Sequence, residues 1–380
     1  MKLSKKMALT AMGAGVAVVL ATYLSACGGT DPLPVKPLTG VVPPAKPTAA
    51  KTNETTTSTF AVTDLFLGES DRQGNLNPSA WKSYGYNIDG KITDKNSTDV
   101  CTRFQGAGSN VQVDGTGGTD NSFGANILPI IQNVGQATPS ATITKAIHDG
   151  GFTLMLNITG LSADAKQTAT GLTGQLFAGA AFDPTGKMAP SFVPGTDWPV
   201  RPELLADGKT VAGGSKVKFG DAYVVNGTWV AGTPAQITLS LGIGGVSLDL
   251  AVNQAVITFD HTAADTGSNG VIAGVIDTDA LITGLKAVAG RLSKSLCQGS
   301  AFDGIANQIR QTSDILKDGT NTKDKPCDGI SIGIGFSTKQ IGNPTKVAPA
   351  AGPSADPCAP DDAGVGADTS TNPTDAAGGG

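Results

Sequence analysis

The sequence has very few of the side chains that most enzymes use for catalysis and metal binding. It contains 2 histidines, His148 and His261, among 380 residues. No H-E-x-x-H helix and no Cys/His cluster is present, which argues against a zinc site. A serine hydrolase is also disfavoured, because the G-x-S-x-G elbow is missing and His261 is interpreted as the polar end of a half-buried strand.

Basic clusters and long apolar runs are missing beyond the N-terminal segment. No Lys/Arg cluster follows Lys6 and the formal net charge is −5, so a nucleic-acid partner is not expected. No later segment approaches the roughly 20 apolar residues that a membrane-spanning helix needs. The cysteines lack the C-x-x-C spacing of zinc and redox sites, and no fixed-period repeat indicates a propeller or solenoid.

The N-terminal segment is typical of a secretory signal over residues 1–26. Three lysines in MKLSKK precede an apolar run that ends in LSAC at Cys27. This end closely resembles the lipobox of bacterial lipoproteins, which implies that Cys27 is diacylated and anchors the mature chain to a membrane. Gly28, in place of Asp, favours the outer over the inner membrane of the cell envelope. The alternative is an ordinary signal peptide with an incidental cysteine.

Composition divides the rest of the chain into three parts. Residues 27–58 are rich in Pro, Thr and Lys, so we expect a flexible stalk that holds a domain off the lipid surface. Residues 59–345 contain the strand and helix patterns without a Pro-rich break and are expected to form one globular domain. Residues 346–380, rich in Ala, Gly, Pro and Asp, are expected to be disordered.

Strand signals are the plainest feature of the central domain. In GFTLMLNITGL (151–161) apolar and polar residues alternate, which predicts a strand with one buried face. In ISIGIGFS (330–337) serines and glycines leave the second face bare, so that face either meets another backbone closely or lines a shallow surface. Asn226–Gly227 predicts a type I′ hairpin.

A meander and three helices complete the expected fold. In residues 235–262, turns are expected at Gly244–Gly245 and at Asn253–Gln254. The helices are expected over 138–148, from about Thr278 to Lys294, and over 300–318. We therefore expect a mainly β, antiparallel β-sandwich-like domain with peripheral helices that cover an end or an edge.

Four cysteines follow Cys27, and their even number in an exported chain suggests two disulfides. They allow three connectivities and are Cys101, Cys297, Cys327 and Cys358. We favour Cys297 with Cys327, because both lie at the ends of one helical segment. By elimination, Cys101 would pair with Cys358.

The stretch VQVDGTGGTDNSFGA (111–125) is the best candidate for an ion site. Calcium takes about six to eight oxygen ligands, and glycine-rich turns let carbonyls converge. The segment departs from an EF-hand loop, since Ala125 stands where the final Glu would be. The alternative is an Asx-rich turn that caps a short helix over 127–131 through Asp120 or Asn121. The expected calcium ligands are Asp114, Asp120 and Asn121, with Asp89, Asp94 and Asp99 approaching from a neighbouring loop.

Two further hypotheses concern glycans. Paired Asp residues could serve a glycosidase, although a sequence does not show which acids face each other. Trp198, in the Pro-rich loop SFVPGTDWPVRPE, is the aromatic residue most expected to be exposed as a sugar-stacking platform. The competing interpretation is that a domain with 5% aromatic residues needs them in its core.

The order of these features resembles predicted bacterial lipoproteins of unknown function. The resemblance rests on the lipobox, YGYNIDG with a nearby cysteine, DGTGGTDNSFG, NGVIAGVIDTDALI before a cysteine, and CDGISIGIGF. It implies export and lipidation, and no reaction or ligand. The first hypothesis is therefore a lipid-anchored binding or structural module, stabilised by calcium, with an envelope protein or glycan as partner. The second is a secreted glycan-directed hydrolase.

Overall fold

The computed structural model describes residues 40–105, 111–134, 138–243, 246–292, 294–297, 299–350 and 358. All of them belong to one compact unit, Pro37–Gly380. Cys27, the signal segment, the Gly244–Gly245 turn and most of the C-terminal tail lie outside the described residues. Within the described part of the chain, no helix has the length and apolarity needed to cross a membrane.

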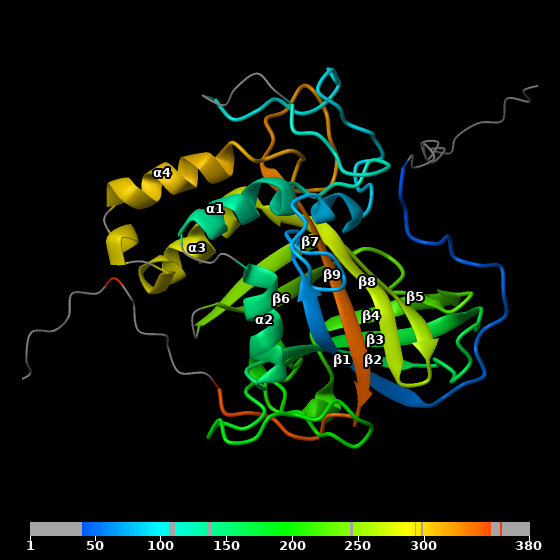
Figure 1. The fold of residues 1–380 in the computed structure, drawn as a ribbon. Helices are drawn as coiled ribbons and strands as arrows, with labels where there is room; N and C mark the ends of the chain where they lie inside the picture. The colour runs from blue at the N-terminus through cyan, green and yellow to red at the C-terminus, as the bar shows by residue number, and fades with distance from the viewer. Residues whose placement is uncertain are drawn as a thin grey trace, which may run out of the picture. The chain divides into compact units, whose positions relative to one another are not determined.

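The described strands form one antiparallel sheet that closes into a barrel (Figure 1). Eight strands make the closed ring, because β5 pairs with β4 on one side and β7 on the other, while β6 extends the sheet from β7. The strands are β1 (Thr57–Phe66), β2 (Thr153–Thr159), β3 (Ala169–Gly179), β4 (Val217–Val225), β5 (Thr228–Val230), β6 (Ala235–Ile243), β7 (Val246–Ala263), β8 (Thr266–Asp277) and β9 (Gly329–Ile341).

The expectation of a mainly β, antiparallel fold is confirmed, but the sandwich is wrong. Closure depends on β7, which runs without a turn from Val246 to Ala263. The predicted turn at Asn253–Gln254 is instead a bulge, with Gln254 at φ 50° and a register shift between Asn253 and Val256. A bulge bends its strand and increases its twist, and bent, tilted strands are what a closed barrel requires.

Side chains pack on both faces of the strands. On one face, Phe60, Trp229 and Phe259 are almost fully buried and in ring contact. On the other face, Met155 and Phe177 are covered by the segment between β3 and β4. The prediction of one buried face for residues 151–161 is therefore wrong, because β2 buries both of its faces. Burying one large apolar side chain is worth about 1.5–3 kcal/mol.

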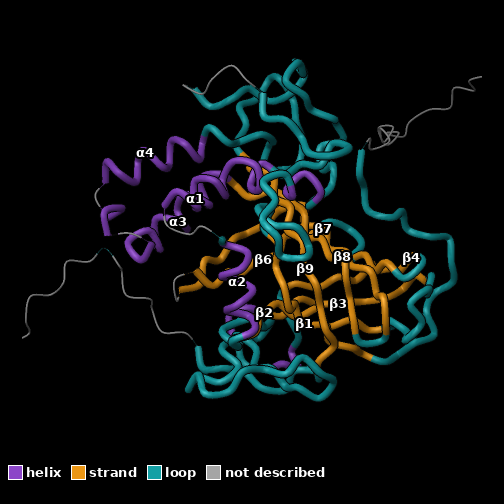
Figure 2. Tube along the Cα trace, viewed as in Figure 1, coloured by secondary structure: helices purple, strands orange, loops and turns teal. Residues whose placement is uncertain are grey.

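The helices lie at the ends of strands (Figure 2). The prediction over 138–148 is confirmed by α2, with Pro139 in its first turn, and α3 begins at Thr278 as expected. The third helix is shorter than predicted, because it ends at Arg310 and the next residues bridge to β9 through Ile315 and Gly329. The helices are α1 (Leu128–Val134), α2 (Pro139–His148), α3 (Thr278–Leu292) and α4 (Gly299–Arg310).

Two local predictions are confirmed by backbone geometry. Asn226 and Gly227 both have positive φ, at 46° and 84°, as a type I′ hairpin between β4 and β5 requires. The bare face of β9 meets another backbone, because a Cβ on Gly333 would lie 2.0 Å from the carbonyl oxygen of Tyr84. A larger side chain at Gly333 would push this neighbouring loop away from the strand.

Residues 40–58 differ from the flexible stalk that composition predicts. The N–H of Val41 donates to the carbonyl oxygen of Gly117 and its carbonyl oxygen accepts from Asn87, while the N–H of Thr52 donates to Thr170 of β3. β1 already begins at Thr57. These backbone groups find partners on the barrel, which an extended polar segment can do without burying apolar surface. Residues 27–39 of the predicted stalk lie outside the described residues.

Candidate functional site

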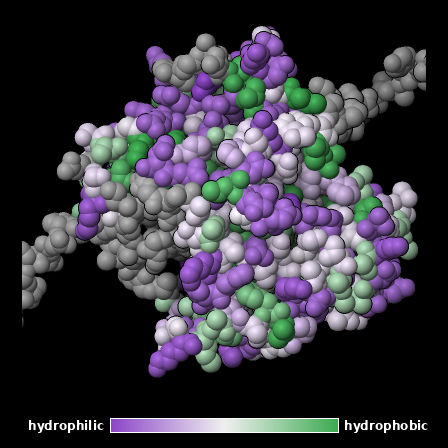
Figure 3. Space-filling view, viewed as in Figure 1, coloured by the Kyte–Doolittle hydropathy of each residue, from purple (hydrophilic) through white to green (hydrophobic). Residues whose placement is uncertain are grey.

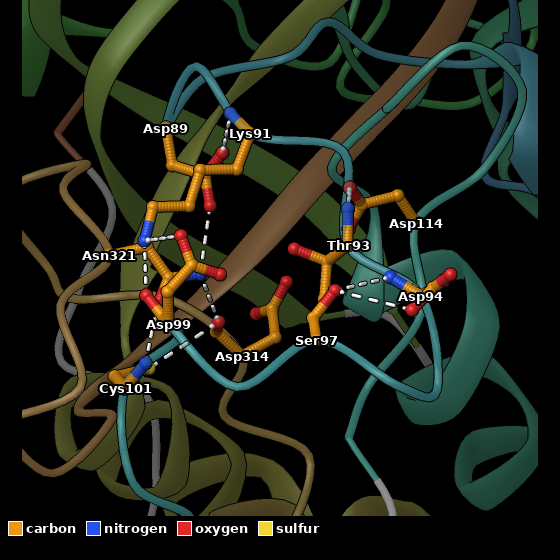
Figure 4. Close-up of polar contacts among 10 residues, drawn as sticks. All are labelled: Asp89, Lys91, Thr93, Asp94, Ser97, Asp99, Cys101, Asp114, Asp314 and Asn321. Carbon is orange, nitrogen blue, oxygen red and sulfur yellow. Dashed lines mark hydrogen bonds and ion pairs between the residues drawn. The ribbon is translucent and has the colours of Figure 1, made fainter.

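Four aspartates from three loops gather beside the barrel end where Cys101 and Cys327 are joined. Asp89 and Asp120 come from loops that follow β1, Asp114 lies between them in sequence, and Asp314 follows α4. Figure 4 shows Asp314 between the loop of Asp89 and the loop of Thr93 and Ser97. The sequence prediction missed Asp314, which is more than 190 residues away from the other three.

Backbone N–H groups hold two of these carboxyls in place. Asp120 Oδ2 accepts hydrogen bonds from the N–H of Ile88 at 2.6 Å and of Asp89 at 3.3 Å. Asp114 Oδ2 accepts one from the N–H of Thr93 at 2.6 Å. Each of these bonds ties the 111–120 loop to the 87–93 loop. Both aspartates therefore join the 111–120 loop to the 87–93 loop by hydrogen bonds.

The other two carboxyls are held in a similar way. Asp89 accepts hydrogen bonds from the N–H of Lys91 at 2.7 Å and from Asn321 Nδ2 at 2.8 Å. Asp314 accepts from the N–H of Ser331 at 2.9 Å and from Ser331 Oγ at 2.5 Å. The cluster thus connects loops that are distant in sequence.

The carboxyls of Asp114, Asp120 and Asp314 hold protons more tightly than ordinary aspartates. Burial raises the pKa of Asp114 to about 7, with a further increase from Asp89 and Asp314. Burial also raises the pKa of Asp314 to about 7, against the hydrogen bonds from Ser331. Burial, then Asp89, Asp114 and Asp314, raise the pKa of Asp120 well above its usual value. Burial and neighbouring negative charges disfavour ionisation of these three carboxyls.

Asn121 is not available as a calcium ligand. Its Nδ2 donates to the carbonyl oxygens of Trp81, Tyr84 and Gly333 at 3.0–3.1 Å. Its Oδ1 accepts from the N–H of Gly333 at 3.0 Å and of Gly124 at 2.9 Å. The bond to Gly124 lies at the start of the helical turn before α1, whose N-cap residue is Ser122. Asn121 therefore holds backbone groups in place, as the alternative of an Asx-rich turn predicts, but it does not occupy the N-cap position.

The predicted calcium ligands do not converge as a set. Among the described residues, no three His, Cys, Asp or Glu side chains are grouped so that they could hold one metal ion. Asp94 closes its own turn by accepting from the N–H of Asn96 at 2.7 Å. Asp99 pairs with Lys91 at 3.0 Å and its side chain is 72% exposed. Asp114 and Asp120 do come together, but without Asn121, Asp94 or Asp99. Calcium binding stays a prediction.

The paired carboxyls do not have the arrangement of a glycosidase. Asp120 lies within hydrogen-bonding reach of Asp114, whereas the two acids of such enzymes stand about 5–5.5 Å or 6.5–9.5 Å apart. Neither residue lines either of the cavities of about 490 and 650 Å³ in the described structure. Asp114 and Asp120 are therefore too close together to be such a pair of acids.

The disulfides differ from the favoured pairing. Cys101 is joined to Cys327, and Cys297 to Cys358. The prediction of Cys297 with Cys327 relied on one helical segment, but Cys327 leaves that segment to pair its backbone with Thr102, donating at 2.8 Å. This contact brings Cys327 beside Cys101, and both cysteines are buried against Leu316.

Trp198 is not an exposed platform. It is 0% exposed, and its Nε1–H donates to the carbonyl oxygen of Ala180 at 2.7 Å. Phe182 and Phe192 pack against its ring at 5.3 and 5.7 Å between centroids. The prolines around Trp198 fold its loop over the outer face of β2 and β3, so the interpretation that aromatics fill the core holds for this residue.

The two histidines lie in different surroundings. His261 is 2% exposed, its ring lies edge-on to Phe60, and burial lowers its pKa. It is therefore more deeply buried than the half-buried strand end expected from the sequence. His148, at the end of α2, is 3.4 Å from Asp64, and its side chain is 53% exposed.

A cavity of about 490 Å³ opens between β1, the loop over residues 69–76 and α2. Its position could not be found from the sequence, because no motif marks it and its three walls come from separate segments. Its polar wall includes Arg72, Lys145 and His148, and an exposed apolar side chain, Leu76, stands at its edge. The remaining lining residues are Asp64, Leu65, Phe66, Glu69, Ser70, Gln73, Gly74, Thr138, Ser140, Ala141, Thr144 and Ser337.

Comparison of the chain with protein-family models, with curated proteins and with solved structures found no match.

Proposed function

We propose that the chain is a lipid-anchored binding module of the cell envelope, and that the cavity beside α2 is its ligand site. The observation that supports binding is this cavity of about 490 Å³, since ligand sites are concave and have volumes of about 300–1,000 Å³. The lipobox resemblance at Cys27 supports anchoring. The closed barrel supports a rigid scaffold, because a closed sheet has no free edge along its ring.

The surface around the barrel is consistent with a protein that works in water. Figure 3 shows hydrophilic side chains interspersed with small hydrophobic patches on the face that it presents. Some of the large exposed apolar residues lie near one another, because Val41 is next to Gly117 and Ile92 is next to Gly118. Small-molecule sites are concave, so the cavity beside α2 is a better candidate for ligand binding than this exposed apolar surface.

Filling the cavity should abolish binding without unfolding the domain. Ala141 lines the cavity from α2 and is exposed, so Ala141→Trp places a large side chain in the site. Thr142→Trp is the matched control, because Thr142 is also exposed on α2 and does not line the cavity. We expect small molecules that raise the melting temperature of the wild type and of Thr142→Trp to have no effect on Ala141→Trp. Equal effects on both variants would contradict the proposed site.

The anchor has its own test. We expect mass spectrometry of the protein from the membrane fraction to show an N-terminal peptide that begins at Cys27 and carries acyl chains, each of which contributes about 0.8 kcal/mol per buried CH₂ to anchoring. An N-terminal peptide without acyl chains in the wild type would contradict lipid anchoring, and would leave the cavity test unaffected.

A further inference from the structure

Arg72 is the charged group of the cavity that lacks a counter-ion. Its Nη2 donates to the carbonyl oxygen of Gly270 at 3.0 Å and its Nη1 to that of Phe336 at 3.4 Å. Its guanidinium also lies 5.0 Å from the centre of the Tyr84 ring. Within the described residues no carboxylate is paired with it, and Asp260 acts on it only at longer range. Neutral carbonyls and a ring orient this cation but do not neutralise it.

The two acids of the same cavity are occupied by other partners. Glu69 is 7% exposed, and its carboxylate accepts from the N–H of Ser140 at 2.6 Å and from Ser140 Oγ at 2.7 Å. Asp64 accepts from Thr63 Oγ1 at 2.7 Å and lies 3.4 Å from His148 Nε2. Neither acid is therefore paired with Arg72 in the described part of the chain, so the guanidinium can accept the negative group of a ligand as its direct partner.

The rest of the wall favours a small molecule with both polar and apolar parts. Ser70 lines the cavity, is 5% exposed, and its hydroxyl has no hydrogen-bond partner among the described residues. Phe66 and Leu76 add apolar surface on the same side, since all three belong to the end of β1 and the loop that follows. A buried hydroxyl without a partner is destabilising, and a hydrogen bond to a ligand would remove this cost.

We propose that this cavity binds a small organic acid, with the ligand carboxylate paired to the guanidinium of Arg72. The inference rests on the proposed function and names the chemical class of the ligand. The planar fork of an arginine matches a carboxylate through two parallel hydrogen bonds. A monoanion fits better than a phosphate dianion, because Glu69 and Asp64 would repel a second negative charge. Free organic acids and N-acylated amino acids share this chemistry.

The test compares acids with amides of nearly the same shape. Binding of benzoate and benzamide, and of N-acetylleucine and N-acetylleucine amide, is measured by calorimetry and by thermal shift on the mature domain. We expect at least one acid to bind about tenfold or more tightly than its amide, a difference of about 1.4 kcal/mol. Arg72→Gln should remove this difference and Arg72→Lys should keep part of it. Arg310→Gln, in an arginine that does not line the cavity, should leave it unchanged.

Three results would overturn the inference. These are equal binding of acid and amide by the wild type, an acid preference that survives in Arg72→Gln, and no binding of any of the acids. Arg72 also donates hydrogen bonds to backbone carbonyls of β8 and β9, so Arg72→Gln could fail to fold. The ratio of acid affinity to amide affinity in the wild type tests the inference without this variant. If the amides bind as tightly as the acids and Ala141→Trp abolishes this binding, the preference for a carboxylate is wrong but the cavity remains the ligand site. If Ala141→Trp leaves binding intact, the proposed site itself is wrong.

Discussion

Removal of the Cys101–Cys327 disulfide should lower the free energy of unfolding by about 3–5 kcal/mol. The bond closes a loop of 226 residues, and a crosslink stabilises mainly by restricting the unfolded chain, more so for a longer loop. Cys101→Ala with Cys327→Ala also removes buried contacts to Leu316. Urea unfolding of the double variant measures the loss.

The second disulfide is the matched control. Cys297–Cys358 spans 61 residues, so the same chain-entropy relation predicts a loss about 1 kcal/mol smaller for Cys297→Ala with Cys358→Ala. Peptide mapping of the unreduced protein by mass spectrometry checks the pairing itself. A peptide that joins Cys297 to Cys327 would show that the pairing favoured from the sequence is right and the structure wrong.

Raising the pH from about 4 to about 8 should remove about 2–4 kcal/mol of the stability supplied by the aspartate cluster. The folded pKa of Asp314 is about 7, against an ordinary value of 3.8. A shift of about 3 units corresponds to about 4 kcal/mol for one group, and partial exposure reduces it. Because the folded pKa is the higher one, the folded state binds more protons than the unfolded state between these values. The contribution is therefore complete below about pH 4 and is lost as the pH rises through about 7.

The cluster is isolated by comparing variants. Asp314→Asn keeps an oxygen that can accept from the N–H of Ser331 but cannot ionise, so its stability should depend less on pH than that of the wild type. Asp94→Asn, in an exposed turn that is not part of the cluster, should behave like the wild type. His261 has the opposite effect, because its lowered pKa makes stability fall as the pH drops below about 6.5. Parallel pH curves for wild type and Asp314→Asn would contradict the assigned protonation.

Calcium is tested in the same experiment. At about pH 8 the cluster carries its largest negative charge, so an ion that binds there should raise stability by RT ln(1 + [L]/Kd). A rise with calcium that Asp120→Asn removes would support the sequence prediction. Equal melting temperatures with calcium and with chelator would contradict calcium binding. The cluster would then be stabilised by protonation of its carboxyls alone.

Local elements could be predicted because the residues that determine them are close in sequence. Pro139 and the apolar period fix α2, and Asn226 with Gly227 fixes a hairpin through positive φ at both positions. The bare face of β9 also follows from its glycines, and the structure identifies the Tyr84 backbone as what covers Gly333.

Features that depend on long-range contacts could not be predicted. The barrel closes because three residues of β5 pair with both β4 and β7. No local sequence pattern distinguishes such a doubly paired strand from an edge strand of an open sheet. The pairing of Cys101 with Cys327 follows from a backbone contact across 226 residues. The predicted exposure of Trp198 is wrong, because prolines and glycine occur both in exposed loops and in loops that fold onto a sheet.

The candidate site shows the same division. The glycine-flanked aspartates of 111–125 do meet the loop of Asp89, as predicted, and Asn121 accepts a hydrogen bond from Gly124 at the start of the next helical turn. Asp314 and the cavity of Arg72 were missed, since each is completed by segments that the sequence separates. The only local signal for the cavity is GESDRQG (68–74), where an acid and a base stand near a serine, and this pattern occurs in many turns.

The most direct test of a ligand site beside α2 is backbone amide mapping by NMR during titration with N-acetylleucine. The account predicts saturable shifts in residues 69–76 and 138–148, with the same amides unmoved in Ala141→Trp. Shifts confined to the aspartate loops, to the outer loop around Trp198, or to no region of the domain would contradict the claim that this cavity is where the protein binds its ligand.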